Sequence, residues 1–153
     1  MRRFPDRRFL YRAGLCMGLA LPGVAPAWAD CLTNAARYHQ VNDVVLRAIA
    51  WEESRMKSWA VRKNSNGSYD IGLTQTNSVH LKELAKFGIG PRHLQDACVS
   101  AFVGAWLYRK KVVKHGNTWV AVGAYHSETP HLRDAYARRV HAIVLRWHRQ
   151  HAP

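Results

Sequence analysis

The chain has 153 residues, with 23 Lys and Arg against 10 Asp and Glu, so its formal net charge is +13 at pH 7. A chain of this length has room for one compact domain with a hydrophobic core but hardly for two. The basic charge favours a polyanionic partner, although charge alone does not choose between nucleic acid, an anionic membrane surface and an acidic glycan.

The first 29 residues have the features of a cleaved export signal. Arginines precede the apolar stretch 13–24, and residues 27–29 (Ala-Trp-Ala) have the small-x-small pattern of a cleavage site. The apolar stretch is too short to span a bilayer, for which about 20 residues are needed. We therefore expect a signal peptide over residues 1–29 and a mature domain over residues 30–153.

Export through a signal peptide has consequences for the secretion route, for the partner and for the state of the cysteines. Residues 7–10 (Arg-Arg-Phe-Leu) lack the usual spacer of a twin-arginine signal, so we expect the general secretory (Sec) route. Export argues against nucleic acid as the partner. An exported protein with an even pair of cysteines normally oxidises them, and we predict that Cys31 and Cys98 form a disulfide. Closing so long a loop stabilises a domain by about 4 kcal/mol in the chain-entropy model.

After the signal, the hydrophobic spacing is that of a helical protein. It predicts helices at residues 32–38, 44–56, 78–86, 94–114 and 118–126. The second is expected to begin at a cap provided by Asn42 or Asp43. A last helix opens with Thr129 as its cap and Pro130 in its first turn, and Tyr136 belongs to its apolar inner stripe.

Residues 58–70 interrupt this series of helices. They are polar and rich in Gly and Asn, which predicts an exposed turn that carries at most a small β-hairpin. No alternating pattern typical of longer strands is present. The expected fold class is therefore mainly α, as a single compact helical domain with at most a small β-hairpin and one disulfide.

An acidic pair, Glu52 and Glu53, stands at the end of the second predicted helix, ahead of an amide-rich turn at 72–77. Cleaving a glycosidic bond needs a proton delivered to the departing oxygen. A carboxylic acid holds that proton near neutral pH only where desolvation raises its pKa. A Glu at the open end of an apolar helix meets this need, but helical periodicity does not choose between the two residues.

Three short motifs together resemble the signature of the soluble-type lytic transglycosylase domain. They are residues 48–54 (Ala-Ile-Ala-Trp-Glu-Glu-Ser), 70–78 (Asp-Ile-Gly-Leu-Thr-Gln-Thr-Asn-Ser) and 124–127 (Ala-Tyr-His-Ser). The chain is similar to small exported members associated with secretion and conjugation machines of the Gram-negative envelope. The resemblance implies an α+β lysozyme-like fold, a periplasmic location and peptidoglycan glycan strands as the substrate.

The resemblance also implies roles for single residues. The family's Glu-Ser pair falls on residues 53–54, which makes Glu53 the catalytic acid and Glu52 a flanking residue. His126 stands where the family usually has Asn, and we expect a satisfied polar residue there rather than a ligand. The substrate-binding positions implied by the motifs are Ser54, Gly72, Gln75, Asn77 and Tyr125.

Several of these positions have alternative, structural interpretations. Gln75 has both a donor and an acceptor to offer a sugar, but it can instead satisfy backbone groups at a buried turn. Asn77 can cap the third helix, and Tyr125 can be a core residue. Near the second motif, Trp59 or Tyr69 is a candidate to stack on a sugar face, with core or rim packing as the alternative.

The implied reaction is non-hydrolytic. Glu53 protonates the oxygen that links N-acetylmuramic acid (MurNAc) to N-acetylglucosamine (GlcNAc), and then takes the proton of the muramic C6 hydroxyl, which closes on C1 to give a 1,6-anhydroMurNAc end. No cofactor is required. No metal site is expected either, because the nine His are scattered without zinc-binding spacing.

Other functions remain open at this point. A hydrolytic lysozyme would use Glu53 together with Asp70, the other acid near the motifs. A catalytically silent peptidoglycan-binding assembly factor would keep the cleft without the reaction. A cationic membrane-active protein would rest on charge and on a C-terminal helix that carries Arg138, Arg139, Arg146 and Arg149. The expected partners are glycan strands and components of an envelope-spanning secretion, pilus or conjugation machine, and the protein is expected to be a monomer.

Overall fold

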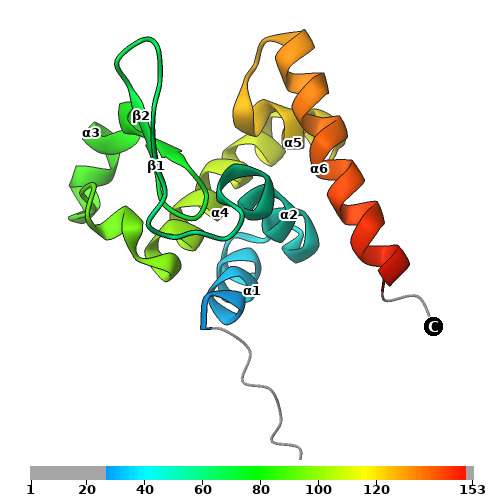
Figure 1. The fold of residues 1–153 in the computed structure, drawn as a ribbon, viewed down its shortest axis with the longest axis horizontal. Helices are drawn as coiled ribbons and strands as arrows, with labels where there is room; N and C mark the ends of the chain where they lie inside the picture. The colour runs from blue at the N-terminus through cyan, green and yellow to red at the C-terminus, as the bar shows by residue number, and fades with distance from the viewer. Residues whose placement is uncertain (1–26, 151–153) are drawn as a thin grey trace, which may run out of the picture.

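The structure, a computed structural model, describes residues 27–150, so most of the predicted signal peptide lies outside it (Figure 1). The described chain forms helices and one three-stranded antiparallel sheet. The α-helices are α1 (Ala27–His39), α2 (Asp43–Ser54), α3 (Leu81–Leu84), α4 (Ala97–His115), α5 (Trp119–His126) and α6 (Pro130–Gln150). The strands are β1 (Val61–Lys63), β2 (Tyr69–Ile71) and β3 (Thr76–Asn77), and the 3₁₀ helices are η1 (Ser78–His80), η2 (Ala85–Phe87) and η3 (His93–Gln95).

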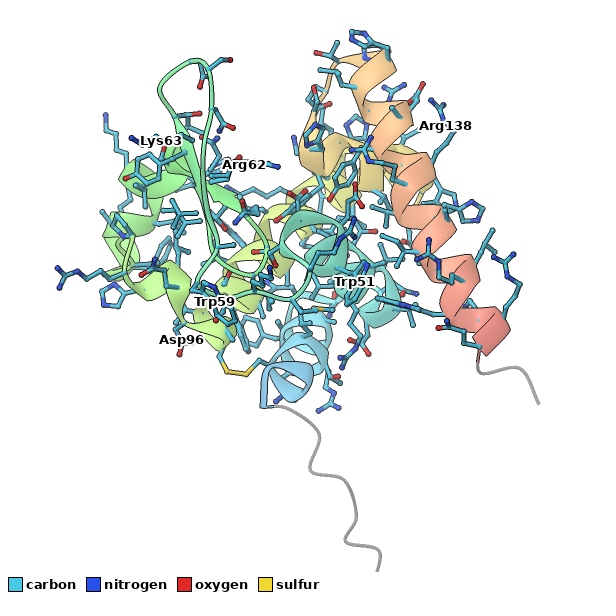
Figure 2. The ribbon with its side chains drawn as sticks, viewed as in Figure 1. Trp51, Trp59, Arg62, Lys63, Asp96 and Arg138 are labelled. Carbon is cyan, nitrogen blue, oxygen red and sulfur yellow. A yellow bond between two sulfur atoms is a disulfide. The ribbon has the colours of Figure 1, made fainter. Side chains whose placement is uncertain are left out.

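The mainly α fold class predicted from the sequence is confirmed, and so is the disulfide. Cys31 of α1 pairs with Cys98 in the first turn of α4, with Cα atoms 5.0 Å apart, and the bond is visible near the foot of α1 in Figure 2. The predicted hairpin is formed by β1 and β2, and a third strand, β3, extends it. Among the described helices, none is long and apolar enough to cross a membrane.

The prediction of one α-helix at 78–86 is wrong. Instead, η1, α3 and η2 follow one another over residues 78–87. The Asn77 side chain caps the first turn by accepting from the backbone N–H of Val79 at 3.0 Å, and Gly88 ends the last turn in the left-handed region with φ of 71°. A segment this short consists mostly of helix ends, where 3₁₀ turns are common.

Side-chain caps fix where the two central helices begin. Asn42, rather than Asp43, caps α2 by accepting from the N–H of Val45 at 3.0 Å. Asp96 caps α4 by accepting from the N–H groups of Cys98 and Val99, each at 2.9 Å. Helix α4 therefore begins at residue 97 and not at residue 94, which lies in η3.

The register of the sheet sets three polar residues in one row. Arg62 on β1 lies opposite Asp70 on β2, and Asp70 lies opposite Asn77 on β3. Residues that are directly opposite in an antiparallel sheet point to the same face. The sheet therefore presents a cation, a carboxylate and an amide side by side.

Helix α4 lies at the centre of the fold and contributes to three hydrophobic clusters. Its Tyr108 packs in a cluster with α2, α5 and α6, its Ala105 packs with α1 and α2, and its Leu107 packs with β2 and α3. Figure 1 shows the sheet and α3 on one side of α4, and α5 and α6 on the other. This helix therefore joins two lobes of the molecule.

The turn that follows β2 packs unusually closely on α4. A Cβ atom added to Gly72 would lie 1.9 Å from the carbonyl oxygen of Leu94 and 2.7 Å from Oγ of Ser100. Thr74, two residues further on and fully buried, donates its hydroxyl to the Ser100 carbonyl at 2.9 Å. A Cβ on Gly104 would clash with the Thr74 side chain at 2.5 Å. Close packing thus fixes the turn on both η3 and the central helix.

We expect Gly72→Ala to lower the free energy of unfolding by about 3 kcal/mol or more, because the new methyl group meets backbone and the residue keeps a positive φ of 84°. Gly88→Ala is the matched control, since Gly88 also has a positive φ but has open space around it; it should cost about 1 kcal/mol. Urea unfolding measures both, and equal losses would contradict this explanation of Gly72.

Candidate active site

Glu53 lies in the last turn of α2, and its carboxylate is largely shielded from water. Only 7 % of its side chain is exposed, and the hydroxyl of Tyr136 on α6 donates to its Oε1 at 2.6 Å. The nearest cation is Arg62, whose Nη2 lies 3.9 Å from Oε2. Glu53 is thus a nearly buried acid with one strong hydrogen bond and one distant cation.

Burial raises the pKa of Glu53 from its ordinary value of 4.5 to about 7. Desolvation is the dominant cause, because it disfavours the charged form. The hydrogen bond from Tyr136 and the charge of Arg62 act in the opposite direction, while the neighbouring carboxylates of Asp70 and Glu52 raise the pKa further. Close to neutral pH, Glu53 can therefore both release and accept a proton.

The structure distinguishes Glu53 from Glu52, which helical periodicity did not. The Glu52 carboxylate accepts from Nε of Arg139 at 2.5 Å and lies 3.7 Å from Nη1 of Arg55. An acid held between two cations is an ion-pair partner that links α2 to α6. Of the two acids, Glu53 is the one whose pKa is raised by burial.

Asp70 is held by the polar row of the sheet. Its Oδ2 accepts from Arg62 at 3.0 Å and from Asn64 at 3.1 Å, and its Oδ1 accepts from Asn77 at 2.6 Å. Both of its oxygens are thus engaged by side chains of the hairpin and of β3. Arg62 bridges this network to Glu53, because the same Nη2 atom faces both carboxylates.

Gln75 and Tyr125 are joined to the turn at 72–75. The amide nitrogen of Gln75 donates to the carbonyls of Ala60 at 3.1 Å and of Gly72 at 2.9 Å, which leaves its amide oxygen for a ligand. Gln75 itself adopts a positive φ of 48°. Tyr125 donates its hydroxyl to the Thr74 carbonyl at 2.8 Å, and burial raises its pKa, so it stays a neutral donor.

A cleft of about 640 Å³ opens beside Glu53. Its walls come from both lobes, with the sheet and η1 on one side and α5 with the following loop on the other, and α4 lies between them. Four of the residues singled out from the sequence line it together: Glu53, Gln75, Asn77 and Tyr125.

Ser54 and Gly72 do not line this cleft. The Ser54 hydroxyl is buried and donates to the Leu73 carbonyl at 2.7 Å, so it ties α2 to the turn. Gly72 makes its close approach to Leu94, behind the turn. Neither does Trp59 line the cleft: it is exposed and lies well below Arg62 in Figure 2, and Tyr69 packs against the core cluster of β2 and α4.

Two residues of the site, Tyr136 and Arg62, were not predicted from the sequence. Tyr136 was placed in the core stripe of the last helix, and it is indeed buried, but its hydroxyl binds Glu53. The available signal was chemical, since a buried Tyr hydroxyl needs a partner. Nothing in the sequence indicated that Arg62 belongs to the site, because only the register of β1 and β2 brings it close to Asp70 and Glu53.

His126 lines the cleft and stacks on Tyr136, with ring centroids 4.9 Å apart and the planes 1° from parallel. Burial lowers its pKa, and the charges of Arg139 and Arg62 lower it further. A neutral ring therefore covers the tyrosine that holds Glu53. Within residues 27–150, no group of three or more metal-binding side chains is gathered.

Comparison with known proteins places this site in a family. Residues 30–142 match the family described as Transglycosylase SLT domain. The chain belongs to this family. Invasion protein IagB of Salmonella typhimurium is 40% identical over 125 residues, which cover 78% of each chain. X polypeptide of Escherichia coli is 37% identical over 136 residues, 84% of this chain and 79% of that protein, and Protein IpgF of Shigella sonnei is 36% identical over 102 residues, 66% and 67% of the two chains.

The match to the transglycosylase family spans the whole site. The acid on α2, the turn after β2, the tyrosine on α5 and the tyrosine on α6 all fall within residues 30–142. The last 21-residue helix is only partly covered, but the covered part includes Tyr136. The SLT domain thus contains each group that contacts Glu53.

The raised pKa of Glu53 predicts a stability effect with a defined sign. Because the folded-state pKa is the higher one, ionising Glu53 costs stability as the pH rises from 4.5 to about 7, and above that the cost is about 3 kcal/mol. Glu53→Gln should therefore stabilise the fold by up to this amount at pH 8 and have little effect at pH 4. Urea unfolding at the two pH values measures this.

Glu52→Gln serves as the control for this measurement. It removes one charge from the adjacent position but breaks the ion pair with Arg139, so no gain in stability is expected at pH 8. If Glu53→Gln also failed to stabilise the fold at pH 8, the carboxyl would not be desolvated as described.

Proposed function

We propose that the protein is a peptidoglycan lytic transglycosylase that cleaves the β-1,4 bond between MurNAc and GlcNAc without water. The observation that carries the proposal is that the nearly buried acid Glu53, with a pKa of about 7, lies on the wall of a cleft in an SLT domain. One group with such a pKa can serve as acid in one step and as base in the next.

In the first step, neutral Glu53 donates its proton to the oxygen of the glycosidic bond, and that bond breaks at C1 of MurNAc. In the second, the Glu53 carboxylate removes the proton of the C6 hydroxyl, and O6 bonds to C1. The acid is regenerated and the product carries a 1,6-anhydroMurNAc end. Tyr136 holds Oε1 in place through both steps, and Arg62 stabilises the transient carboxylate.

The arrangement of Asp70 favours this reaction over hydrolysis. A lysozyme-type mechanism needs a second carboxylate free to attack the sugar or to activate water. Here both oxygens of Asp70 are engaged by Arg62, Asn64 and Asn77, which suits a residue that orders the sheet beside the cleft. Hydrolysis by Glu53 and Asp70 stays the second candidate, because Asp70 also lines the cleft.

The proposed setting follows from the relatives and from the N-terminal sequence. A relative that is 40% identical over most of its length is named an invasion protein. We propose that this chain is exported by its N-terminal signal, acts as a monomer in the periplasm, and opens the wall locally for a secretion, pilus or conjugation apparatus. A silent assembly factor is disfavoured, since it would have no need for an acid whose burial destabilises the fold.

Loss of the acid should abolish the reaction. We expect Glu53→Gln to lower the rate of muropeptide release from purified sacculi on the order of a thousandfold, because an amide delivers no proton. Mass spectrometry of the wild-type products should show 1,6-anhydro ends. Free reducing ends as the sole product would instead show hydrolysis, and equal release by both proteins would contradict the role of Glu53.

The pH dependence should report the same group. Activity (kcat/KM) is expected to fall above about pH 7, where Glu53 loses the proton needed for the first step. Arg62→Gln should move this fall to higher pH, because the cation that favours the carboxylate is gone. The measurement is the initial rate on sacculi from pH 5 to 9, and a shift to lower pH would oppose this assignment.

A further inference from the structure

A stripe of lysines runs along the face of α4 that lies in the cleft. Lys110, Lys111 and Lys114 line the same cleft as Glu53, and they follow Leu107 at helical spacings of three, four and seven residues. From Lys110 to Lys114, the stripe therefore extends about 6 Å along the helix axis. These three residues are called the lysine floor below.

The lysine floor is anchored to both lobes by ion pairs. Lys110 contacts both carboxylate oxygens of Glu83 on α3, at 2.9 and 3.1 Å. Lys111 and Lys114 lie 2.6 and 3.2 Å from the two oxygens of Glu128, which belongs to the loop between α5 and α6. The lysines are thus held in place on both sides of the cleft.

Positive charge nevertheless exceeds negative charge at this end of the cleft. Glu128 is shared by Lys111, Lys114 and His115, and these contacts lower its pKa to about 2. Glu83, the partner of Lys110, does not line the cleft. Glu128 is therefore the one carboxylate that both contacts these lysines and lines the cleft, whose other acids, Glu53 and Asp70, lie near Arg62.

These ion pairs can be exchanged at little cost. The lysine side chains are 45 %, 28 % and 60 % exposed, in chain order, and exposed ion pairs contribute only about 0–1 kcal/mol each. A carboxylate brought by a ligand can replace Glu128 as the partner of one lysine while the other lysine keeps it. The floor is therefore suited to bind an additional anion.

We propose that the lysine floor binds carboxylates of the short peptides attached to the glycan strand, so that the protein prefers peptide-bearing strands. This inference rests on the proposed function. The glycan backbone of such strands is uncharged where the muramic lactyl group is joined to a peptide, whereas the peptides carry free carboxylates. An anion at the floor would therefore come from the peptide, beside the sugar chain held near Glu53.

The experiment compares two forms of one substrate. Purified sacculi are used either untreated or after their peptide carboxylates have been converted to neutral amides, which changes charge but hardly size. The readout is the initial rate of 1,6-anhydromuropeptide release at low substrate concentration. We expect the wild-type protein to prefer untreated sacculi by about tenfold, and this preference to shrink with added salt.

The double variant Lys111→Met/Lys114→Met should reduce the preference to near unity while leaving the rate on amidated sacculi largely unchanged. Methionine keeps the length of the side chain and suits a helix. The control is Lys82→Met/Lys86→Met, which removes the same charge from exposed positions outside the cleft and should keep the preference. The proposal would be overturned if the floor variant preferred untreated sacculi as strongly as the wild type does, or if both double variants lost this preference to the same extent.

The test separates this inference from the proposed function. If the wild-type protein released no anhydro products, the proposed function would fail. Co-sedimentation with the two kinds of sacculi would then still report whether the lysine floor selects carboxylates. Thermal unfolding checks that the double variants are folded, and Lys114→Met alone, at the most exposed position of the floor, provides a milder version.

Discussion

The fold depends on the contact between the turn at residues 72–75 and helix α4. Three helices bind this turn through side chains: Ser54 of α2 binds the Leu73 carbonyl, Ser100 of α4 exchanges hydrogen bonds with Thr74, and Tyr125 of α5 binds the Thr74 carbonyl. The turn has no regular secondary structure to satisfy its own backbone groups, so these side chains take that role. The result is a rigid junction at the inner end of the cleft.

The junction explains how a small domain holds Glu53 in a position that costs stability. The acid sits one residue before the serine that is tied to the turn, so its backbone has little freedom. Tyr136 fixes the side chain from α6. The protein thus holds an acid with a pKa of about 7 by packing it between the turn at residues 72–75 and the last helix.

The environment of Glu53 balances two opposite demands. Desolvation keeps the proton on the acid, while the tyrosine hydrogen bond and Arg62 make its removal possible. Arg62 is itself restrained by Asp70, and Asp70 by Asn64 and Asn77. A row of polar side chains across a three-stranded sheet therefore sets how strongly one cation acts on the acid.

The helical class, the disulfide and the place of Glu53 at the end of α2 could be predicted from the sequence, because apolar spacing, cysteine number and short motifs are local signals. The cap of α2 was narrowed to Asn42 or Asp43, and the structure selects Asn42. The placement of Arg62 and Tyr136 could not, since one depends on strand register and the other on the docking of α6. Gly72 was expected to approach a sugar, whereas the structure explains it by the carbonyl of Leu94. A sequence motif does not distinguish residues that pack behind a site, such as Gly72, from residues that face it.

The bond between Tyr136 and Glu53 joins positions 83 residues apart. Every motif that identifies the chain lies before residue 128, yet the acid is not fully enclosed until the final helix has docked. A chain in which α6 had not yet docked would therefore contain all three motifs but would lack the hydrogen bond from Tyr136 to Glu53. Docking of the final helix is therefore what completes the environment of Glu53.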